Sequence, residues 1–371
     1  NLPPLATPPG ETERVTIPWR RETLHSGQDA FLFVSAHLRE ETAWGPKGHE
    51  VAWKQLPLSL PTLAWPERRD RLRGGWTLCS NSRLQFDSGR AQSSFRIDPE
   101  RGLDSIQMDQ TELLNSPLRL NLWRCPTDND GSRGGAGSPD QPLSRWLAQG
   151  LNRLTQTGRM DGCVSEALPQ IRQSQVYRTG SGHEVRMALN AKSTIMGALR
   201  LVLQFDVPQG LEDLPRLGVT LSLLPGFETF HWYGRGPHEN YADRNSGSWF
   251  GRFTSTVSDQ YVPYILPQEH GNHTEVRWFA LENGEQGLLV CSDPPLSASV
   301  SHFSADDLYA ARHTIDLTPR PETNVNLDLQ QRGLGTLSCG PDTLGRYRVC
   351  SGVHQIVLWL QPYHIGAFEL S

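Results

Sequence analysis

Residues 232–244 read Trp-Tyr-Gly-Arg-Gly-Pro-His-Glu-Asn-Tyr-Ala-Asp-Arg, and this stretch decides how the rest of the chain is interpreted. Two glycines and a proline in four consecutive positions exclude a helix and predict a tight backbone turn. The residues after the turn carry imidazole, carboxylate, amide, phenol and guanidinium groups within one short loop. Such a loop is typical of a hydrogen-bonded structural corner or of a polyol-binding site. Composition alone favours the corner, because buried polar side chains mostly satisfy backbone groups.

The order of these residues resembles the Gly-x-Gly-Pro-x-Glu-Asn-Tyr-x-Asp-Arg signature in the last domain of LacZ-type β-galactosidases, which belong to glycoside hydrolase family 2. A second segment, Arg124 to Asp130, is similar to the family's Arg-x-Pro-x-Asp-Asn-Asp pattern. Two further runs, Tyr261 to Gly271 and Asn326 to Pro341, resemble the family's Tyr-x-Pro-Tyr and Asn-x-Asp…Gly-x-Gly blocks. The resemblance therefore covers nearly the whole chain and is strongest from Arg124 to Pro341.

Hydrophobic residues alternate with period two through most of the sequence, which predicts an all-β protein. Leu201 to Val207, Leu217 to Leu223 and Val325 to Leu329 are the clearest examples. One convincing helix is predicted from Pro142 to Thr155, with Ser144 as a possible cap, and a second short helix includes Asp307 to Arg312.

The chain is predicted to contain two domains. In residues 1–66, alternation at Val15, Ile17 and Trp19 and an apolar run from Phe31 to Val34 predict short strands. The prolines between Pro57 and Arg69 predict a stiff connection. The resemblance implies that residues 1–66 are part of an immunoglobulin-like β-sandwich. It implies that residues 67–371 form the β-galactosidase small-chain domain, a large antiparallel β-supersandwich similar to galactose mutarotase.

The resemblance also implies roles for individual residues. The loop that follows Arg124 borders the galactose pocket in this family, and one residue near the end of the chain stands where some members carry a tryptophan that stacks on galactose. The implied substrate-binding residues are Asp128, Asn129, Asp130, Gly131 and Cys339. The implied structural or pocket-supporting residues are Arg235, Glu239, Asn240, Asp243 and Arg244.

No catalytic residue is assigned to this chain. A retaining glycosidase needs two carboxylates about 5 Å apart on a rigid scaffold, and this family carries them on a (β/α)₈ barrel of about 250 residues. No such pattern occurs here. The resemblance therefore implies a non-catalytic C-terminal portion or small subunit, whose partner is a catalytic barrel segment or large subunit. Mg²⁺ and Na⁺ are implied for the complete enzyme, which is expected to be an oligomer acting on β-galactosides.

Two other function classes stay open. The first is a stand-alone carbohydrate-binding β-sandwich. The second is an aldose 1-epimerase, in which an acid and base pair would come from His231, His238, Glu239, Glu269 or His270. His270 and His273, with Glu269 and Glu275 beside them, are the densest group of possible metal ligands. A hydrogen-bonded loop is favoured over a metal site, because Gly271 and Asn272 disfavour the helix that would align the two histidines.

The composition limits which binding partners and which cellular location are expected. The net charge is -5 and the pI is about 6.2, so nucleic acid is not expected as a partner. No apolar stretch is long enough for a membrane span, and a cytoplasmic protein is expected. Six scattered cysteines are expected to be reduced thiols. The chain begins at Asn1 without a methionine and is expected to be part of something longer. The glycine-rich loop from Gly131 to Gly137 is expected to be mobile in isolation.

Overall fold

The computed structural model describes residues 2, 4–18, 29–59, 75–79, 82–88, 91–133, 138–160, 164–165, 170–194 and 197–367. The chain separates into two compact units, Asn1–Leu63 and Ala64–Ser371. Most of the predicted connection from Pro57 to Arg69 lies outside the described residues, as do residues 134–137 of the predicted mobile loop.

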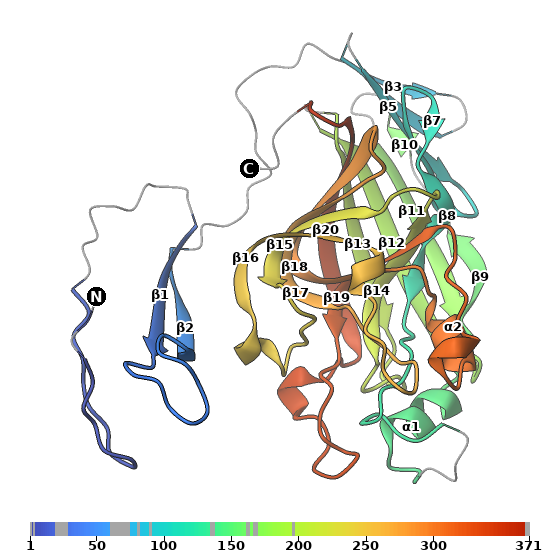
Figure 1. Cartoon of the computed structure of the whole chain (residues 1–371). Coiled ribbons are helices and arrows are strands. Elements are labelled where there is room, and N and C mark those ends of the chain that lie inside the picture. The colour runs from blue at the N-terminus through green and yellow to red at the C-terminus, as the bar shows by residue number, and fades with distance from the viewer. Residues whose placement is uncertain are drawn as a thin grey trace. The chain divides into compact units, whose positions relative to one another are not determined.

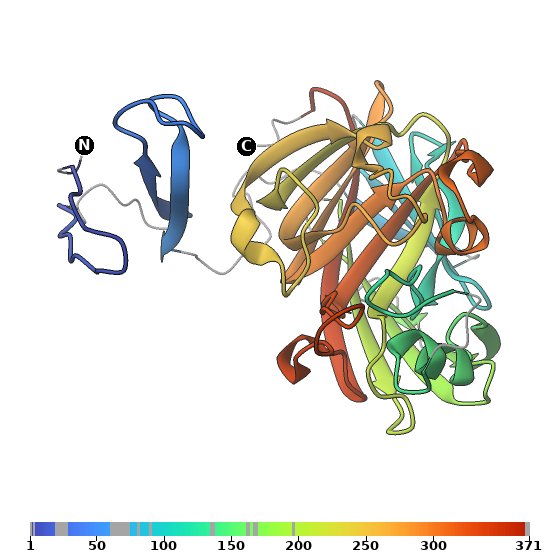
Figure 2. The same cartoon turned by 60° about the horizontal axis from the view of Figure 1, so that its bottom comes forward.

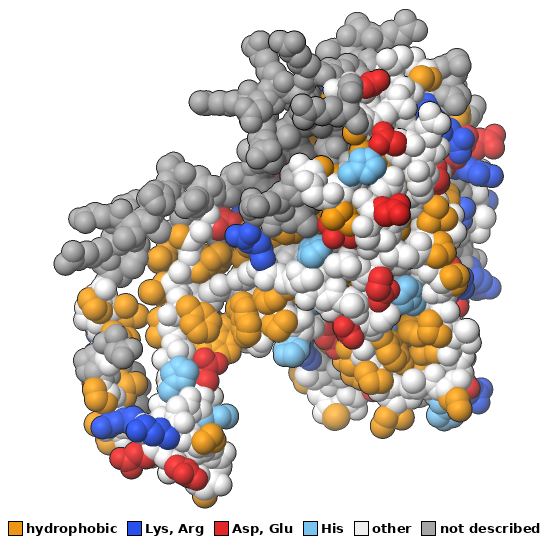
Figure 3. Space-filling model, turned by 45° about the horizontal axis from the view of Figure 1, so that its top comes forward, with side chains coloured by type: hydrophobic (Ala, Val, Ile, Leu, Met, Phe, Trp, Pro, Cys, Tyr) orange, Lys and Arg blue, Asp and Glu red, His pale blue; other side chains and the backbone are white. Residues whose placement is uncertain are grey.

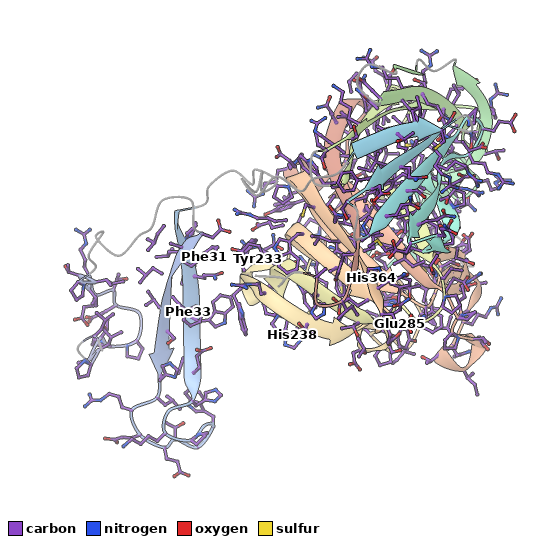
Figure 4. All side chains as sticks on the ribbon, turned by 90° about the horizontal axis from the view of Figure 1, so that it is seen from above. Phe31, Phe33, Tyr233, His238, Glu285 and His364 are labelled. Atoms are coloured by element: carbon purple, nitrogen blue, oxygen red, sulfur yellow. The ribbon has the colours of Figure 1, made fainter. Side chains whose placement is uncertain are left out.

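The smaller unit contains an antiparallel hairpin of β1 (Ala30–His37) and β2 (Glu50–Ser59). Phe33 stacks on Trp53 across the hairpin, with ring centroids 5.8 Å apart. Figure 4 shows Phe31 and Phe33 along β1. The strand predicted from the apolar run is thus confirmed.

The strand predicted at Val15 and Ile17 is wrong. Residues 11–18 have no regular secondary structure, and Trp19 lies outside the described residues. A strand needs a hydrogen-bonded neighbour, and within the described part of this unit only β1 and β2 pair with each other. Alternation in the sequence therefore does not produce a strand where no partner is available.

Thirteen strands of the larger unit form one antiparallel sheet within the described ranges. Its main path runs β10-β11-β12-β13-β20-β18-β17-β15-β16, and β8, β9, β14 and β19 pair beside this path. Figures 1 and 2 show these strands curling around a common interior. The strands are β8 (Leu114–Asn121), β9 (Thr155–Met160), β10 (Val164–Ser165), β11 (Gln170–Arg178), β12 (Glu184–Ser193), β13 (Leu199–Val207), β14 (Arg216–Leu223), β15 (Thr229–Gly236), β16 (Trp249–Thr256), β17 (His273–Glu282), β18 (Gln286–Ser301), β19 (Thr323–Gln331) and β20 (Gly352–His364).

A second, five-stranded sheet belongs to the same unit and is labelled at the upper right of Figure 1. Its strands pair in chain order, and all pairs are antiparallel. Ser93 Oγ donates to the carbonyl of Gly197 at 3.2 Å, which joins this sheet to the larger one. The strands are β3 (Gly75–Cys79), β4 (Arg83–Asp87), β5 (Gln92–Asp98), β6 (Gly102–Met108) and β7 (Thr111–Glu112).

The period-two alternation places one face of each central strand in the core. On β13, Leu201, Leu203 and Phe205 are completely buried, while Gln204 and Asp206 between and after them point outward and are exposed. Burying one such side chain contributes about 1.5 to 3 kcal/mol. The described part of the chain contains no parallel strand pair. The predicted all-β, antiparallel fold is therefore confirmed.

The first helix, α1 (Pro142–Ala148), is shorter than the predicted 142–155. Gly150 has a φ of +66°, a conformation that ends a helix, and the chain turns there before β9 begins. Ser144 was expected to cap this helix, but it lies inside the helix. The N-cap is Gln141, which makes no side-chain cap hydrogen bond.

The second helix, α2 (Ala305–Ala310), begins two residues before the predicted Asp307 and ends before the predicted Arg312, because Ala311 is already extended. Its cap is Ser304, whose Oγ accepts the N–H of Asp307 at 3.1 Å while the Asp307 carboxylate accepts the N–H of Ser304 at 2.8 Å. This reciprocal pair fixes where the helix starts. Four short 3₁₀ turns are described, namely η2 (Asn245–Gly247), η3 (Ser258–Gln260), η4 (Thr314–Asp316) and η5 (Gly345–Tyr347).

The distribution of basic side chains, the lengths of the helices and the state of the cysteines can be compared with the expectations from composition. On the face shown in Figure 3, the described Lys and Arg side chains are scattered rather than gathered into one patch. None of the helices within the described ranges is long and apolar enough to cross a membrane. The described cysteines are free thiols, and Cys163 lies outside the described residues.

Candidate functional site

Asn240 is the centre of the corner that follows β15. Its side chain is buried, and its Nδ2 donates to the carbonyls of His238 at 3.0 Å and Arg235 at 3.3 Å. Its Oδ1 accepts the N–H of Thr274 at 2.8 Å. The backbone N–H of Asn240 donates to the carbonyl of Asn272 at 2.7 Å. Asn240 therefore satisfies backbone groups on both sides of the turn and ties it to the start of β17.

Glu239 is half-buried and accepts hydrogen bonds from three donors. Its Oε2 accepts the N–H of Gly271 at 2.8 Å and the hydroxyl of Tyr241 at 3.3 Å. Its Oε1 accepts the hydroxyl of Tyr264. Burial, and then the neighbouring Glu239 carboxylate, raise the pKa of both phenols, so both remain protonated donors. The Glu239 carboxylate is thus held by one donor from its own loop and by two donors from the segment before β17.

Asp243 fixes the loop after β19 through backbone amides. Its Oδ1 accepts the N–H of Leu334 at 2.9 Å, and its Oδ2 accepts the N–H of Gly335 at 2.8 Å. A Cβ on Gly333 would lie only 2.7 Å from the Asp243 carboxyl carbon. Arg244 donates to the carbonyl of Gly335. Glycine is therefore required at position 333, because a side chain there would displace the carboxylate that holds this loop.

Arg235 makes the remaining contacts of the corner. Its Nε lies 3.0 Å from a carboxylate oxygen of Glu275, and one terminal nitrogen donates to the carbonyl of Ser248 at 3.0 Å. Trp232 Nε1 donates to the carbonyl of Arg235 at 3.0 Å. All five residues that the sequence marked as structural or pocket-supporting thus hydrogen-bond within or around this corner.

Asp130 folds the loop after β8 back on itself. Its carboxylate is fully buried against the Arg124 guanidinium, also fully buried, with N–O distances of 2.7 and 3.0 Å. It also accepts the N–H of Thr127 at 2.9 Å. Gly131 is buried as well, with φ +135°. Asp130 and Gly131, which were predicted to bind the sugar, are therefore buried residues that stabilise the conformation of this loop.

Asp128 and Asn129 lie on the outer side of the same loop. Asp128 is exposed, and its backbone N–H donates to Oε1 of Gln268 at 3.0 Å. Asn129 bridges to the loop after β19, where Nδ2 donates to the carbonyl of Gly335 at 3.1 Å and Oδ1 accepts the hydroxyl of Ser338 at 2.6 Å. Two segments 209 residues apart are thereby joined.

Cys339 is exposed and follows Ser338 directly. It therefore lies beside the contact that Asn129 makes. The structure brings Asp128, Asn129 and Cys339 to one connected surface, formed by the loop after β8 and the loop after β19. Asp243 and Arg244 support the second of these loops from the corner.

A buried network of arginines and carboxylates under this surface was not predicted. Arg216 donates to Glu269 at 2.5 Å and lies 3.5 Å from Asp328, and all three side chains are at least 94 % buried. Burial raises the pKa of Asp328 to about 7, against the opposing effect of Arg216. Arg216 is the only charged residue of β14, a strand in which all residues but Thr220 are buried. A charged residue at such a position is the signal that could have indicated the network.

Four of the five residues considered as an epimerase acid and base pair have other partners for their side chains. His231 lies 3.3 Å from Glu282 on the neighbouring strand β17. Figure 4 shows His238 near the end of β15, and this residue is exposed. Glu269 is buried and engaged by Arg216. Glu239, described above, is bonded to tyrosines and an amide.

The histidines of the 270–273 loop take part in hydrogen bonds. His270 Nδ1 lies 3.0 Å from the carbonyl of Gln268. His273 lies between the Arg235 carbonyl at 3.1 Å and Gln260 Oε1 at 2.7 Å, and burial lowers its pKa to about 4. Within the described ranges, no group of three or more His, Cys, Asp or Glu side chains could hold a metal ion. These residues therefore do not fit a metal site of that kind.

Comparison with known families gives a match over most of the chain. The model for the β-galactosidase small chain matches residues 89–358, and the model for β-galactosidase domain 4 matches residues 1–59. The chain belongs to the β-galactosidase small-chain family. This confirms the resemblance drawn from the Arg124, Arg235 and Gly333 motifs.

Curated β-galactosidases are similar to this member of the family. One from Arthrobacter sp. is 32% identical over 341 residues, which are 85% of this chain and 31% of that protein. One from Aeromonas hydrophila is 30% identical over 346 residues, or 90% of this chain and 32% of that protein. The chain thus spans about a third of the length of these relatives. A solved structure titled as a putative aldose 1-epimerase from Escherichia coli K12 matches 78% of this chain and 100% of its own length, at 13% identity and a TM-score of 0.37.

Proposed function

We propose that this chain is the non-catalytic C-terminal portion, or a separate small subunit, of a β-galactosidase that hydrolyses terminal β-D-galactosides. The observation that carries the proposal is the junction of Asn129 with Gly335 and Ser338, beside the exposed Asp128. Two family motifs far apart in sequence meet there and present polar groups outward. The absence of any parallel strand pair in the described ranges agrees with catalysis on a barrel elsewhere.

In this proposal the site residues divide into two roles. Asp128, Asn129 and Cys339 border the galactose. Asp130 and Gly131 hold the first loop from below, as their burial supports. The corner residues hold the second loop, mainly through the Asp243 carboxylate. Cys339 cannot supply the aromatic face that stacks on a sugar ring, an interaction of roughly 1 kcal/mol beyond burial, so galactose contact here relies on polar groups.

The proposed partner is a catalytic barrel segment or large subunit, within an oligomer in the cytoplasm. That partner carries the carboxylates that act on the glycosidic bond. Mg²⁺ and Na⁺, implied by the family resemblance, belong with the partner in this proposal. The residues of this chain contribute the wall and the support of the pocket.

A chimera tests the proposal. The segment of the Arthrobacter sp. relative that this chain matches is replaced by the full chain, and hydrolysis of a chromogenic β-galactoside is measured. The isolated chain is measured in parallel. We expect an active chimera and an inactive isolated chain. In the chimera, Asn129→Ala should raise KM several-fold, because the loop carrying Ser338 and Cys339 loses its contact.

The other outcomes separate the remaining function classes. Galactose binding by the isolated chain, measured by calorimetry, together with a folded but inactive chimera would favour a stand-alone carbohydrate-binding protein. Accelerated interconversion of the galactose anomers by the isolated chain would favour an epimerase. Either result would overturn the proposal.

A further inference from the structure

Ile265 and Ile315 are almost fully exposed, at 90% and 91%, more than any other large hydrophobic residue within the described ranges. They come from loops about 50 residues apart in sequence. Thr314 Oγ1 donates to the carbonyl of Tyr264 at 3.5 Å, so the residues directly before the two isoleucines are in contact. Single exposed aliphatic residues are common on protein surfaces. Two of them, on loops that contact each other, offer apolar surface whose removal from water would be favourable.

Both isoleucines are presented by anchored backbone. Before Ile265, the Tyr264 hydroxyl donates to Glu239, and its N–H donates to the carbonyl of Val262 at 2.8 Å. Ile315 lies in η4, where Oδ2 of Asp316 accepts the N–H of His313 at 2.9 Å. Because the backbone of both turns is already fixed, a partner that docks there would not have to order it, which lowers the entropic cost of binding.

A cleft of about 420 Å³ lies next to Ile315, between η4 and the end of α2. Its walls include Ala311, Arg312, Asp316 and Leu317. A protruding apolar residue beside a hollow with apolar and charged walls suits a folded protein partner. Aliphatic side chains offer no flat aromatic face for a sugar ring, so a glycan is a poorer fit.

The Ile265 loop is also joined to the proposed sugar-bordering loop. Gln268, three residues after Ile265, accepts the Asp128 N–H at 3.0 Å and donates to its carboxylate at 3.4 Å. A partner that closes the galactose pocket over Asp128 would therefore reach Ile265 as well. A second copy of this chain has no such reason to lie there.

We infer that Ile265 and Ile315 form a docking surface for the catalytic barrel portion of a β-galactosidase, with the adjacent cleft receiving a side chain of that portion. The inference rests on the proposed function and names the surface through which the two portions meet. In the relatives that this chain matches, about two thirds of the polypeptide lies outside the matched segment, which is ample for such a partner.

Hydrogen–deuterium exchange on the chimera and on the isolated chain tests the inference. Residues 262–268 and 312–318 should exchange at least tenfold more slowly in the chimera. The double variant Ile265→Ser and Ile315→Ser should lower chimera activity at least tenfold and restore fast exchange. The control is Val353→Ser, an exposed aliphatic residue on β20, which should leave both readouts unchanged. Thermal melts of the isolated chain should show equal stability for all variants.

Each outcome decides between the two proposals. An active chimera with unprotected loops, or with unchanged activity in the double variant, overturns the docking surface and leaves the proposed function standing. A folded but inactive chimera overturns the proposed function and the docking surface with it. Protection in the isolated chain that rises with its concentration assigns the surface to a second copy and also overturns the inference.

Discussion

Glu239→Ala tests whether the corner after β15 is structural. The substitution removes the acceptor for the N–H of Gly271 and the hydroxyls of Tyr241 and Tyr264. Tyr241 is 3% exposed, so water cannot easily replace the lost acceptor. A buried donor left without a partner costs about 1 to 3 kcal/mol. Two such donors, the amide and the Tyr241 hydroxyl, give an expected loss of roughly 2 to 6 kcal/mol.

The assay is thermal and urea unfolding of the isolated chain. For a domain of this size a loss of about 1 kcal/mol lowers the Tm by about 2 °C, so the expected fall in Tm is about 4 to 12 °C. Glu239→Gln keeps one acceptor oxygen and should recover about half of the loss. The matched control is Glu285→Ala, labelled in Figure 4 on an exposed turn, which should change stability by less than about 0.5 kcal/mol.

The opposite result would refute this reasoning. If Glu239→Ala leaves the Tm unchanged while the chimera loses galactoside affinity, the carboxylate faces the sugar rather than the corner. An equal loss in Glu239→Ala and Glu285→Ala would show that the measurement reports charge and not hydrogen bonding.

Three further perturbations follow from the buried groups. Burial raises the pKa of Asp328 to about 7, above its value near 4 in the unfolded chain. The folded protein therefore binds this proton more tightly than the unfolded chain does. The resulting contribution to stability is fully present below pH 4 and is lost as the pH rises through 7. Relative to Asp328→Asn, the wild-type unfolding free energy should fall by roughly 2 to 3 kcal/mol between pH 5 and 8, and parallel pH profiles would contradict this. Burial lowers the pKa of His273 to about 4. The neutral imidazole therefore contributes stability above pH 6.5, and this contribution is lost as the pH falls through 4. In His273→Phe, the urea concentration at the unfolding midpoint should fall less steeply as the pH is lowered than in the wild type. Asp243→Ala should accelerate hydrogen exchange at Leu334 and Gly335, because their amides donate to its carboxylate. Asp259→Ala on the surface turn η3 should leave that exchange unchanged, and equal exchange in both variants would remove Asp243 from its proposed role.

The sequence predicts a strand well where the alternation of residues within that strand alone shows which face is buried. Period-two alternation at Leu201, Leu203 and Phe205 identifies a strand with one buried face, and the structure buries those residues completely. The same rule fails at Val15, because a strand also needs a neighbour to pair with. The predicted length of α1 is wrong as well. The periodic apolar residues continue beyond Ala148, but Gly150 has a positive φ and the helix ends before it.

The candidate site was predictable as a set of motifs but not as a geometry. Asp128 and Asp130 are the same residue type, two positions apart in one loop, and yet one is exposed and the other is fully buried. What separates them is Arg124, whose guanidinium draws Asp130 inward and leaves Asp128 outside. Likewise, Gly333 is required only because the Asp243 carboxylate, far away in sequence, lies where its Cβ would stand. Such constraints belong to pairs of residues brought together by the fold. One sequence shows the members of each pair, and only the folded chain shows which of them meet.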